Sequence, residues 1–454
     1  MKKIEFFGAG SGEVTGSCYL ITAEDTNQAL VDFGMFQGSE KMEKKNFETL
    51  PFSASGLQGV FITHAHLDHT GRLPLLVFGG FKGKIYMTGP TKSFVEIILN
   101  DSARIAEKEH QTPLYTSEEV WKVMNMIEAV EYDTPIKAGS FTATFRDAGH
   151  ILGSASIEIV DESSDKKDKI VFSGDLGNTP QSIVKPTQYI DSADYVVMES
   201  TYGSSAHPDE AAETIIQEEI NAVEKNGGVL LIPAFALERT QEILHIIHHL
   251  KKDKKVREDT PVFLDSPMGI DATAVYMDFK EYYNDEIKSH ETIPFNFEGL
   301  VITDNPRDSK DIIKAATPKV IVAGSGMMSG GRILHHALSY LGDSSTRVLF
   351  VGYQAEETLG REIINGIKTV VINKETVQVR AHIREMKILS SHADLPRLLK
   401  WVGHIKGVKK VFLTHGELPQ QEELKAHITS TLSLKEVYLP QNGEEFSLSS
   451  VEIA

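Results

Sequence analysis

Four side chains of the metal-binding kind lie within six residues, His64 to His69. The segment Thr63–His69 reads Thr-His-Ala-His-Leu-Asp-His and follows the apolar stretch Gly59–Ile62. Imidazole nitrogen and carboxylate oxygen are donors that zinc and manganese take in proteins. Three histidines and one aspartate offer more donors than one tetrahedral ion uses. The segment therefore indicates two adjacent metal ions and a hydrolase.

Other polar residues also follow apolar stretches, most of them beside small residues. They are Asp32, His150, Asp175, Glu199, His392 and His415. Small neighbours let backbone and ligand approach closely. Taken alone, each of these residues is also explained by a structural role in a turn or a helix cap, so their weight comes from the set.

The elements that must position these residues are short apolar strands separated by Gly-rich turns. In the first two hundred residues we expect strands at 29–33, 59–63, 84–88, 169–173 and 195–199, and helices at 93–108 and 117–129. The polar residues cluster after the carboxyl ends of the strands, where α/β sheets usually gather a site.

A second stretch, about 204–376, alternates buried strands with helices. We expect strands at 228–233, 261–265, 319–323 and 346–351, with a helix at 238–251 after the first of them. Strands separated by helices imply a parallel sheet, so this stretch is predicted to be an α/β module of its own. From residue 377 the chain returns to short strands and loops.

Composition limits the classes of protein that fit. A chain of 454 residues is too long to fold around a single hydrophobic core, so two domains are expected. A single cysteine, Cys18, excludes an internal disulfide and a zinc site built from several cysteines. It also fits a cytoplasmic protein. No apolar run is long enough to span a bilayer, so no membrane is expected. The net charge of −18 argues against binding a polyanion through bulk charge, but allows a nuclease whose positive potential comes from metal ions.

The full set of residues resembles a known family. The order Asp32, His64-x-His66-x-Asp68-His69, His150, Asp175 resembles the metallo-β-lactamase fold, and the segments Glu199–Gly203, Ser391–Asp394 and Thr414–Glu417 resemble the three extra motifs of its β-CASP branch. The resemblance is closest to relatives of the pre-mRNA 3′-end-processing endonuclease. It implies an α/β protein, a metallo-β-lactamase αββα sandwich formed by residues 1–203 and 377–454, with an inserted α/β β-CASP domain at 204–376.

The resemblance also implies a role for each site residue. One divalent ion is expected on His64, His66 and His150, and a second on Asp68, His69 and His415, with Asp175 bridging them. Asp68, Glu199 and His392 are the expected catalytic residues, and His392, oriented by Glu199, is the proton donor. Asp32 is expected to fix the histidine-rich loop. The two ions are expected to be zinc, with manganese as the alternative.

The implied function is hydrolysis of single-stranded RNA by a two-metal ribonuclease, with endonuclease and 5′-exonuclease action both open. In the family that the chain resembles, the third extra motif carries a histidine in RNA-acting members and typically a valine in DNA-acting ones, so His415 favours RNA. The alternatives are a hydrolase of DNA or of a small-molecule ester, and a non-catalytic RNA-processing subunit; a homodimer is also open. Arg332 and Arg361 fit either a phosphate clamp or a surface ion pair. The Gly324–Arg332 loop fits either a backbone nest for RNA phosphate or a plain loop. His335–His336 are expected to be surface or packing residues and not metal ligands.

Overall fold

A computed structural model describes residues 1–108, 112–178, 181–208, 211–290, 294–355, 357–386 and 388–448. The contacts divide the chain into a first unit, Met1–Ala206 with Ser391–Ala454, and a second unit, His207–Ser390. By these contacts the chain returns to the first unit at Ser391. The reason is that β19 (His382–Glu385) pairs in parallel with β16 (Arg347–Phe350) inside the second unit.

Two seven-stranded sheets build the first unit. The first has the order β22 (Glu445–Ser447), β1 (Lys3–Phe6), β2 (Tyr19–Thr22), β3 (Gln28–Val31), β4 (Leu57–Phe61), β5 (Lys84–Thr88) and β6 (Ile127–Val130). The second has the order β21 (Val437–Tyr438), β20 (Lys410–Thr414), β11 (Tyr195–Glu199), β10 (Lys169–Phe172), β9 (Ala155–Asp161), β8 (Phe141–Asp147) and β7 (Ile136–Ala138).

The two sheets pack face to face through large apolar side chains. Phe6 of β1 lies 5.3 Å, ring centre to ring centre, from Phe412 of β20, and Tyr19 of β2 lies 5.7 Å from Phe172 of β10. All four rings are buried in one cluster that takes residues from both sheets. Burial of such rings removes a large apolar area from water and holds the two layers together.

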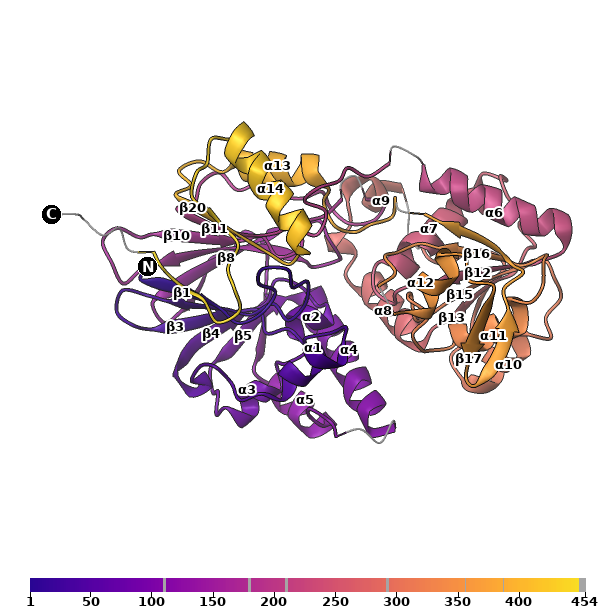
Figure 1. Cartoon of the computed structure of the whole chain (residues 1–454), viewed down its shortest axis with the longest axis horizontal. Helices are drawn as coiled ribbons and strands as arrows, with labels where there is room; N and C mark the ends of the chain where they lie inside the picture. The colour runs from indigo at the N-terminus through magenta and orange to yellow at the C-terminus, as the bar shows by residue number, and fades with distance from the viewer. Residues whose placement is uncertain are drawn as a thin grey trace. The chain divides into compact units, whose positions relative to one another are not determined.

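Helices cover the outer faces of both sheets (Figure 1). On the first sheet they are α1 (Glu40–Lys44), α2 (Leu67–Thr70), α3 (Leu75–Phe78), α4 (Gly89–Lys108) and α5 (Ser117–Met124). On the second sheet they are α13 (Leu395–His404) and α14 (Leu418–Thr431), which bury Trp401 and Leu424 against Val196 and Val411. The predicted αββα sandwich is confirmed.

One predicted helix is shorter than expected. The helix predicted at 117–129 begins as expected, with a capping box between Thr116 and Glu119, but α5 ends at Met124. Residues Ile127–Val130 form β6 instead and pair in parallel with β5. The unpaired edge of β5 supplies a complete hydrogen-bond ladder, which outweighs the local helical pattern.

The second unit is built on a parallel six-stranded sheet, as predicted. Its order is β14 (Leu300–Ile302), β13 (Val262–Asp265), β15 (Lys319–Ala323), β12 (Val229–Pro233), β16 and β19, with a separate hairpin of β17 (Thr369–Ile372) and β18 (Glu375–Gln378). Its helices are α6 (Ala212–Asn226), α7 (Arg239–Lys252), α8 (Pro267–Asp278), α9 (Asp285–His290), α10 (Pro306–Ile312), α11 (Ile333–Tyr340) and α12 (Leu359–Ile364).

A buried polar network ties three elements of this second unit together. The Asp265 carboxylate ends β13 and accepts hydrogen bonds from Arg332 Nη1 at 2.7 Å and His336 Nε2 at 2.7 Å. Arg332 also donates to the Thr303 carbonyl. Arg332 is therefore used in a largely buried ion pair, and His336 is a packing residue. Among the described residues, no helix combines the length and the apolar character needed to cross a membrane.

Candidate metal centre

The histidine-rich segment lies between β4 and α2, and Asp32 fixes its start. Thr63 donates its backbone N–H and its hydroxyl to the two oxygens of Asp32, both at 2.8 Å. His69 Nδ1 donates to the same carboxylate at 2.8 Å. Asp32 follows β3, which pairs in parallel with β4, so both strands deliver their polar residues to one edge of the sheet.

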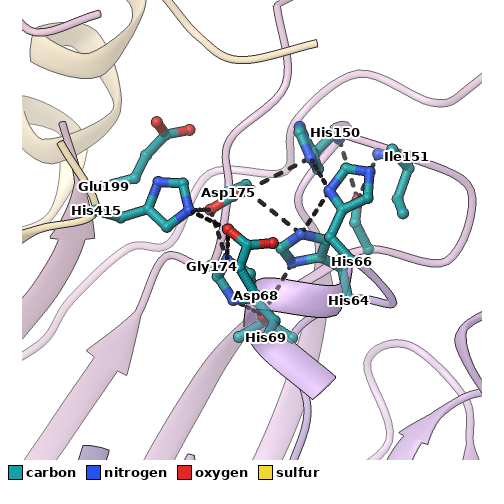
Figure 2. Close-up of polar contacts among 12 residues, drawn as sticks. His64, His66, Asp68, His69, His150, Ile151, Gly174, Asp175, Glu199 and His415 are labelled. Carbon is teal, nitrogen blue, oxygen red and sulfur yellow. Dashed lines mark hydrogen bonds and ion pairs between the residues drawn. The ribbon is translucent and has the colours of Figure 1, made fainter. Parts of the chain in front are cut away.

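The second sheet delivers its polar residues in the same way. β10, β11 and β20 run parallel to one another, and Asp175, Glu199 and His415 lie at or just beyond their carboxyl ends. His150 follows β8, and His392 lies just before α13. The structure thus brings together every predicted site residue, all of them within the first unit. Figure 2 shows Asp175 at the centre of the labelled side chains.

One group of four donors consists of His64, His66, His150 and Asp175, whose ligand atoms all lie within 4.8 Å of one another. His66 Nδ1 lies 3.0 Å from His64 Nε2 and 3.2 Å from His150 Nε2. Asp175 Oδ2 lies 3.3 Å from His64 Nε2. Donors at about 2.0 Å from a tetrahedral zinc ion are about 3.3 Å apart, so these separations fit one such ion.

The protonation of this group also fits a cation. Burial lowers the pKa of His64 and His150, and lowers the pKa of His66 to about 3. The three imidazoles are therefore neutral at neutral pH, as metal ligation requires. Uncharged nitrogens that converge on a buried point beside the Asp175 carboxylate are the chemistry of a metal site.

A second group consists of Asp68, His69 and His415. His415 Nε2 lies 3.1 Å from Asp68 Oδ2, and His69 Nε2 lies 3.4 Å from the other oxygen of Asp175, Oδ1. Asp175 Oδ1 is buried and has no hydrogen-bond partner among the described residues. A buried carboxylate oxygen without a partner is costly unless a cation satisfies it.

The charge of the second group differs from that of the first. Burial opposes protonation of His69 and His415, yet the carboxylates around them, Asp175 foremost, outweigh burial and raise the pKa of both rings. Burial likewise opposes ionisation of Asp175, but the surrounding histidines hold its pKa well below the usual range. The negative charge that favours a proton here also favours a divalent cation.

The second ring nitrogen of most of these histidines is held by a neighbour. His150 Nδ1 donates to the Ser391 carbonyl at 3.1 Å. Thr201 Oγ1 lies 3.1 Å from His415 Nδ1 and donates to the His415 carbonyl at 3.1 Å. Because a hydroxyl has one proton, Thr201 accepts from Nδ1–H, which leaves the lone pair on Nε2. Such outer partners fix ring orientation and tautomer.

Thr201 was not predicted from the sequence. It lies two residues after Glu199 in the segment that resembles the first extra motif, but a threonine at a strand end gives no sign of which histidine it contacts. The partner, His415, is 214 residues away in the chain.

His392 and Glu199 form a pair at the edge of this centre. His392 Nδ1 lies 3.2 Å from both carboxylate oxygens of Glu199, and Nε2 lies 3.9 Å from Asp175 Oδ2. The Leu176 backbone N–H donates to Glu199 at 2.7 Å and orients it. Burial opposes protonation, but Glu199 and Asp175 outweigh it and raise the pKa of His392 to about 9. The ring is therefore a cation at neutral pH, and it faces Glu199 with Nδ1.

Three family models match successive parts of the chain. The model of the metallo-beta-lactamase superfamily matches residues 11–200, and that of the Beta-Casp domain matches residues 240–363. The model of the Zn-dependent metallo-hydrolase RNA specificity domain matches residues 376–440.

Curated proteins resemble the chain over nearly its whole length. Ribonuclease TTHA0252 of Thermus thermophilus is 36% identical, across 96% of this chain and 98% of that protein. The RNase J-like protein of Methanocaldococcus jannaschii is 31% identical, across 96% and 98%. Transcription termination factor FttA of Thermococcus kodakarensis is 30% identical, across 94% of this chain and 68% of that protein.

A solved structure shares the fold. It is a protein of unknown function from Enterococcus faecalis V583, with a TM-score of 0.58 over 99% of this chain and 100% of that chain. At 13% identity this likeness shows the fold alone.

Proposed function

Because the chain belongs to the β-CASP branch of the metallo-β-lactamase superfamily, we propose that it is a two-metal ribonuclease that hydrolyses single-stranded RNA. Its relatives of known name include a ribonuclease and an RNase J-like protein. The observation that carries the proposal is Asp175, whose two oxygens face two separate groups of histidines, at 3.3 Å and 3.4 Å.

The proposed ligands are the two groups of donors described above. His64, His66 and His150 would hold one ion and Asp68, His69 and His415 the other, and Asp175 would offer one carboxylate oxygen to each group. Nitrogen and carboxylate donors without thiolate suit zinc, with manganese as the alternative. Two divalent ions held there would supply Lewis acidity, which would lower the pKa of an attacking water and offset charge on the phosphoryl oxygens.

The chain's own residues supply the proton for the leaving group. As water attacks phosphorus it gives up one proton to solvent, the bond from phosphorus to the leaving oxygen breaks, and that oxygen takes the proton from His392 Nε2. Nδ1 cannot act as the donor because it is bonded to Glu199 at 3.2 Å. The buried Glu199 carboxylate keeps the imidazole charged and directs Nε2 away from itself.

The test is cleavage of labelled RNA of one sequence with a 5′-monophosphate or a 5′-triphosphate, beside the same strand as DNA and as an RNA duplex. We expect cleavage of single-stranded RNA that is abolished in His66→Ala, a variant that keeps the wild-type circular dichroism spectrum. The product ladder separates internal cleavage from 5′-exonuclease action. No cleavage of any RNA by the metal-loaded protein, or cleavage confined to DNA or to small esters, contradicts the proposal.

A further inference from the structure

The sheet of the second unit has a topological switch point between β12 and β16. From β12 the chain passes through α7 to β13, toward the β14 edge of the sheet. From β16 it passes through α12 and the β17–β18 hairpin to β19, at the opposite edge. Open α/β sheets bind ligands at the carboxyl ends of two neighbouring strands whose connections diverge in this way. The topology therefore marks the loops that follow β12 and β16.

Both loops carry an exposed aromatic side chain. Phe235 follows β12 and is 38% exposed, and Tyr353 follows β16 and is 54% exposed. Within the described part of the second unit, these two are the aromatic residues among its exposed large hydrophobic side chains. An exposed ring gains little from folding, so two rings at a topological switch point indicate a ligand surface.

The Phe235 ring packs on bare backbone. A β-carbon placed on Gly326 would lie 2.7 Å from Phe235 Cδ2, and one placed on Gly352 would lie 3.2 Å from Cε2. The two glycines belong to the loops after β15 and β16, so the ring spans both. Their lack of side chains lets the Cδ2–Cε2 edge of the ring approach both loops closely, while 38% of the residue stays exposed.

A buried amide holds this support in place. Gln354, 1% exposed, donates from Nε2 to the Gly326 carbonyl at 2.9 Å and to the Gly352 carbonyl at 3.1 Å. One side chain thus ties together the two loops beneath Phe235. A ring held in this way needs little further ordering when a ligand binds, which favours affinity.

We propose that Phe235, together with Tyr353 of the loop after β16, is a stacking subsite for unpaired bases of single-stranded RNA; this subsite rests on the proposed function. Exposed rings stack on any base and so serve strand binding without sequence preference. The net charge of −18 weakens attraction for the phosphate backbone, so contacts that do not depend on charge carry more of the binding. Duplex RNA, whose bases are already stacked, gains nothing from such a surface.

The test compares Phe235→Leu, Tyr353→Leu and Phe235→Trp in the full-length, metal-loaded protein. Stacking on one ring changes affinity by about 5- to 150-fold. We expect the leucine variants to raise KM for single-stranded RNA by a factor in this range with little change in kcat, and Phe235→Trp to keep the wild-type KM. The matched control is Phe78→Leu, which removes a ring that is 63% exposed on α3 of the first unit and should leave KM unchanged.

Direct binding separates this subsite from the proposed activity. A single-stranded RNA containing 2-aminopurine is titrated into chelator-treated protein, and quenching of its fluorescence reports stacking. Gly326→Ala is a second test that keeps the ring but displaces it, so it should weaken quenching as Phe235→Leu does.

Each outcome decides one of the two proposals. If the wild type cleaves RNA and neither Phe235→Leu nor Gly326→Ala changes KM or quenching, the subsite is wrong and the ribonuclease proposal stands. If quenching depends on Phe235 but no RNA is cleaved, the subsite stands and the activity does not. A changed oligomeric state with unchanged RNA affinity would make the rings a protein interface and overturn the subsite.

Discussion

Replacing Asp32 by asparagine is expected to weaken metal binding at a centre that Asp32 does not itself join. The Asp32 carboxylate accepts three hydrogen bonds at 2.8 Å, two from Thr63 and one from His69 Nδ1. An asparagine oxygen still accepts from the Thr63 backbone, but its amide group then faces His69 as a donor. The His69 proton is driven from Nδ1 to Nε2, the atom that lies 3.4 Å from Asp175.

The size of the effect follows from these contacts. Loss of an outer partner of a ligating histidine lowers metal affinity by about 10- to 100-fold. Each buried hydrogen bond that is lost costs about 1–3 kcal/mol, so Asp32→Asn should also lower the free energy of unfolding of the metal-free protein by a similar amount. Zinc affinity is measured by competition with a fluorescent chelator, and unfolding by denaturant titration.

Asp265→Asn is the matched control. Asp265 is also a buried carboxylate at a strand end, bonded to His336 Nε2 at 2.7 Å, but it belongs to the second unit. It should lose stability and keep the wild-type zinc affinity. Wild-type zinc affinity in Asp32→Asn, or an equal loss in Asp265→Asn, refutes the idea that Asp32 acts through the tautomer of His69.

Three further predictions concern His392, Asp265 and Thr201. Burial opposes protonation of His392 but Glu199 outweighs it, so Glu199→Gln should lower the pKa of His392 from about 9 and move the alkaline limb of the kcat–pH profile to lower pH; an unmoved limb argues against the proton-donor pair. Burial opposes ionisation of Asp265, but its hydrogen bonds outweigh burial and lower its pKa to about 2. The ionised carboxylate therefore contributes its whole stabilisation above about pH 4, and this contribution is lost as the pH falls toward 2. That loss is about 2 kcal/mol relative to Asp265→Asn, measured by denaturant titration at each pH, and parallel curves for the two proteins contradict it. Thr201→Val should weaken zinc binding through His415, whereas Thr201→Ser, which keeps the hydroxyl, should bind zinc as tightly as the wild type. Equal zinc affinities in the wild type and both variants would contradict a positioning role for Thr201.

The sequence predicted much of this fold because strand ends are visible in it. Polar residues such as Asp175 and Glu199 interrupt apolar runs, and the parallel pairing of β10 and β11 brings such ends to one edge. The helix predicted at 117–129 was wrong in its last turn, because the local hydrophobic pattern carries no information about the unpaired edge of β5. Pairing of this kind depends on residues distant in sequence.

The outer contacts of the site could not be predicted for the same reason. Thr201 contacts a histidine 214 residues away, and Arg332 contacts Asp265, 67 residues away. Arg332 fitted a phosphate clamp or a surface ion pair in the sequence, and only the fold shows that its partner is a buried carboxylate. Residue type and spacing identify candidate ligands, while their partners depend on tertiary packing.

The central claim is that Asp175 joins two metal ions, and anomalous diffraction at the zinc absorption edge tests it directly. Crystals of the zinc-loaded protein should show two anomalous peaks about 3.5–4 Å apart, one among His64, His66 and His150 and one among Asp68, His69 and His415, with Asp175 between them. A single peak, peaks away from Asp175, or no peak in zinc-loaded crystals would contradict the account.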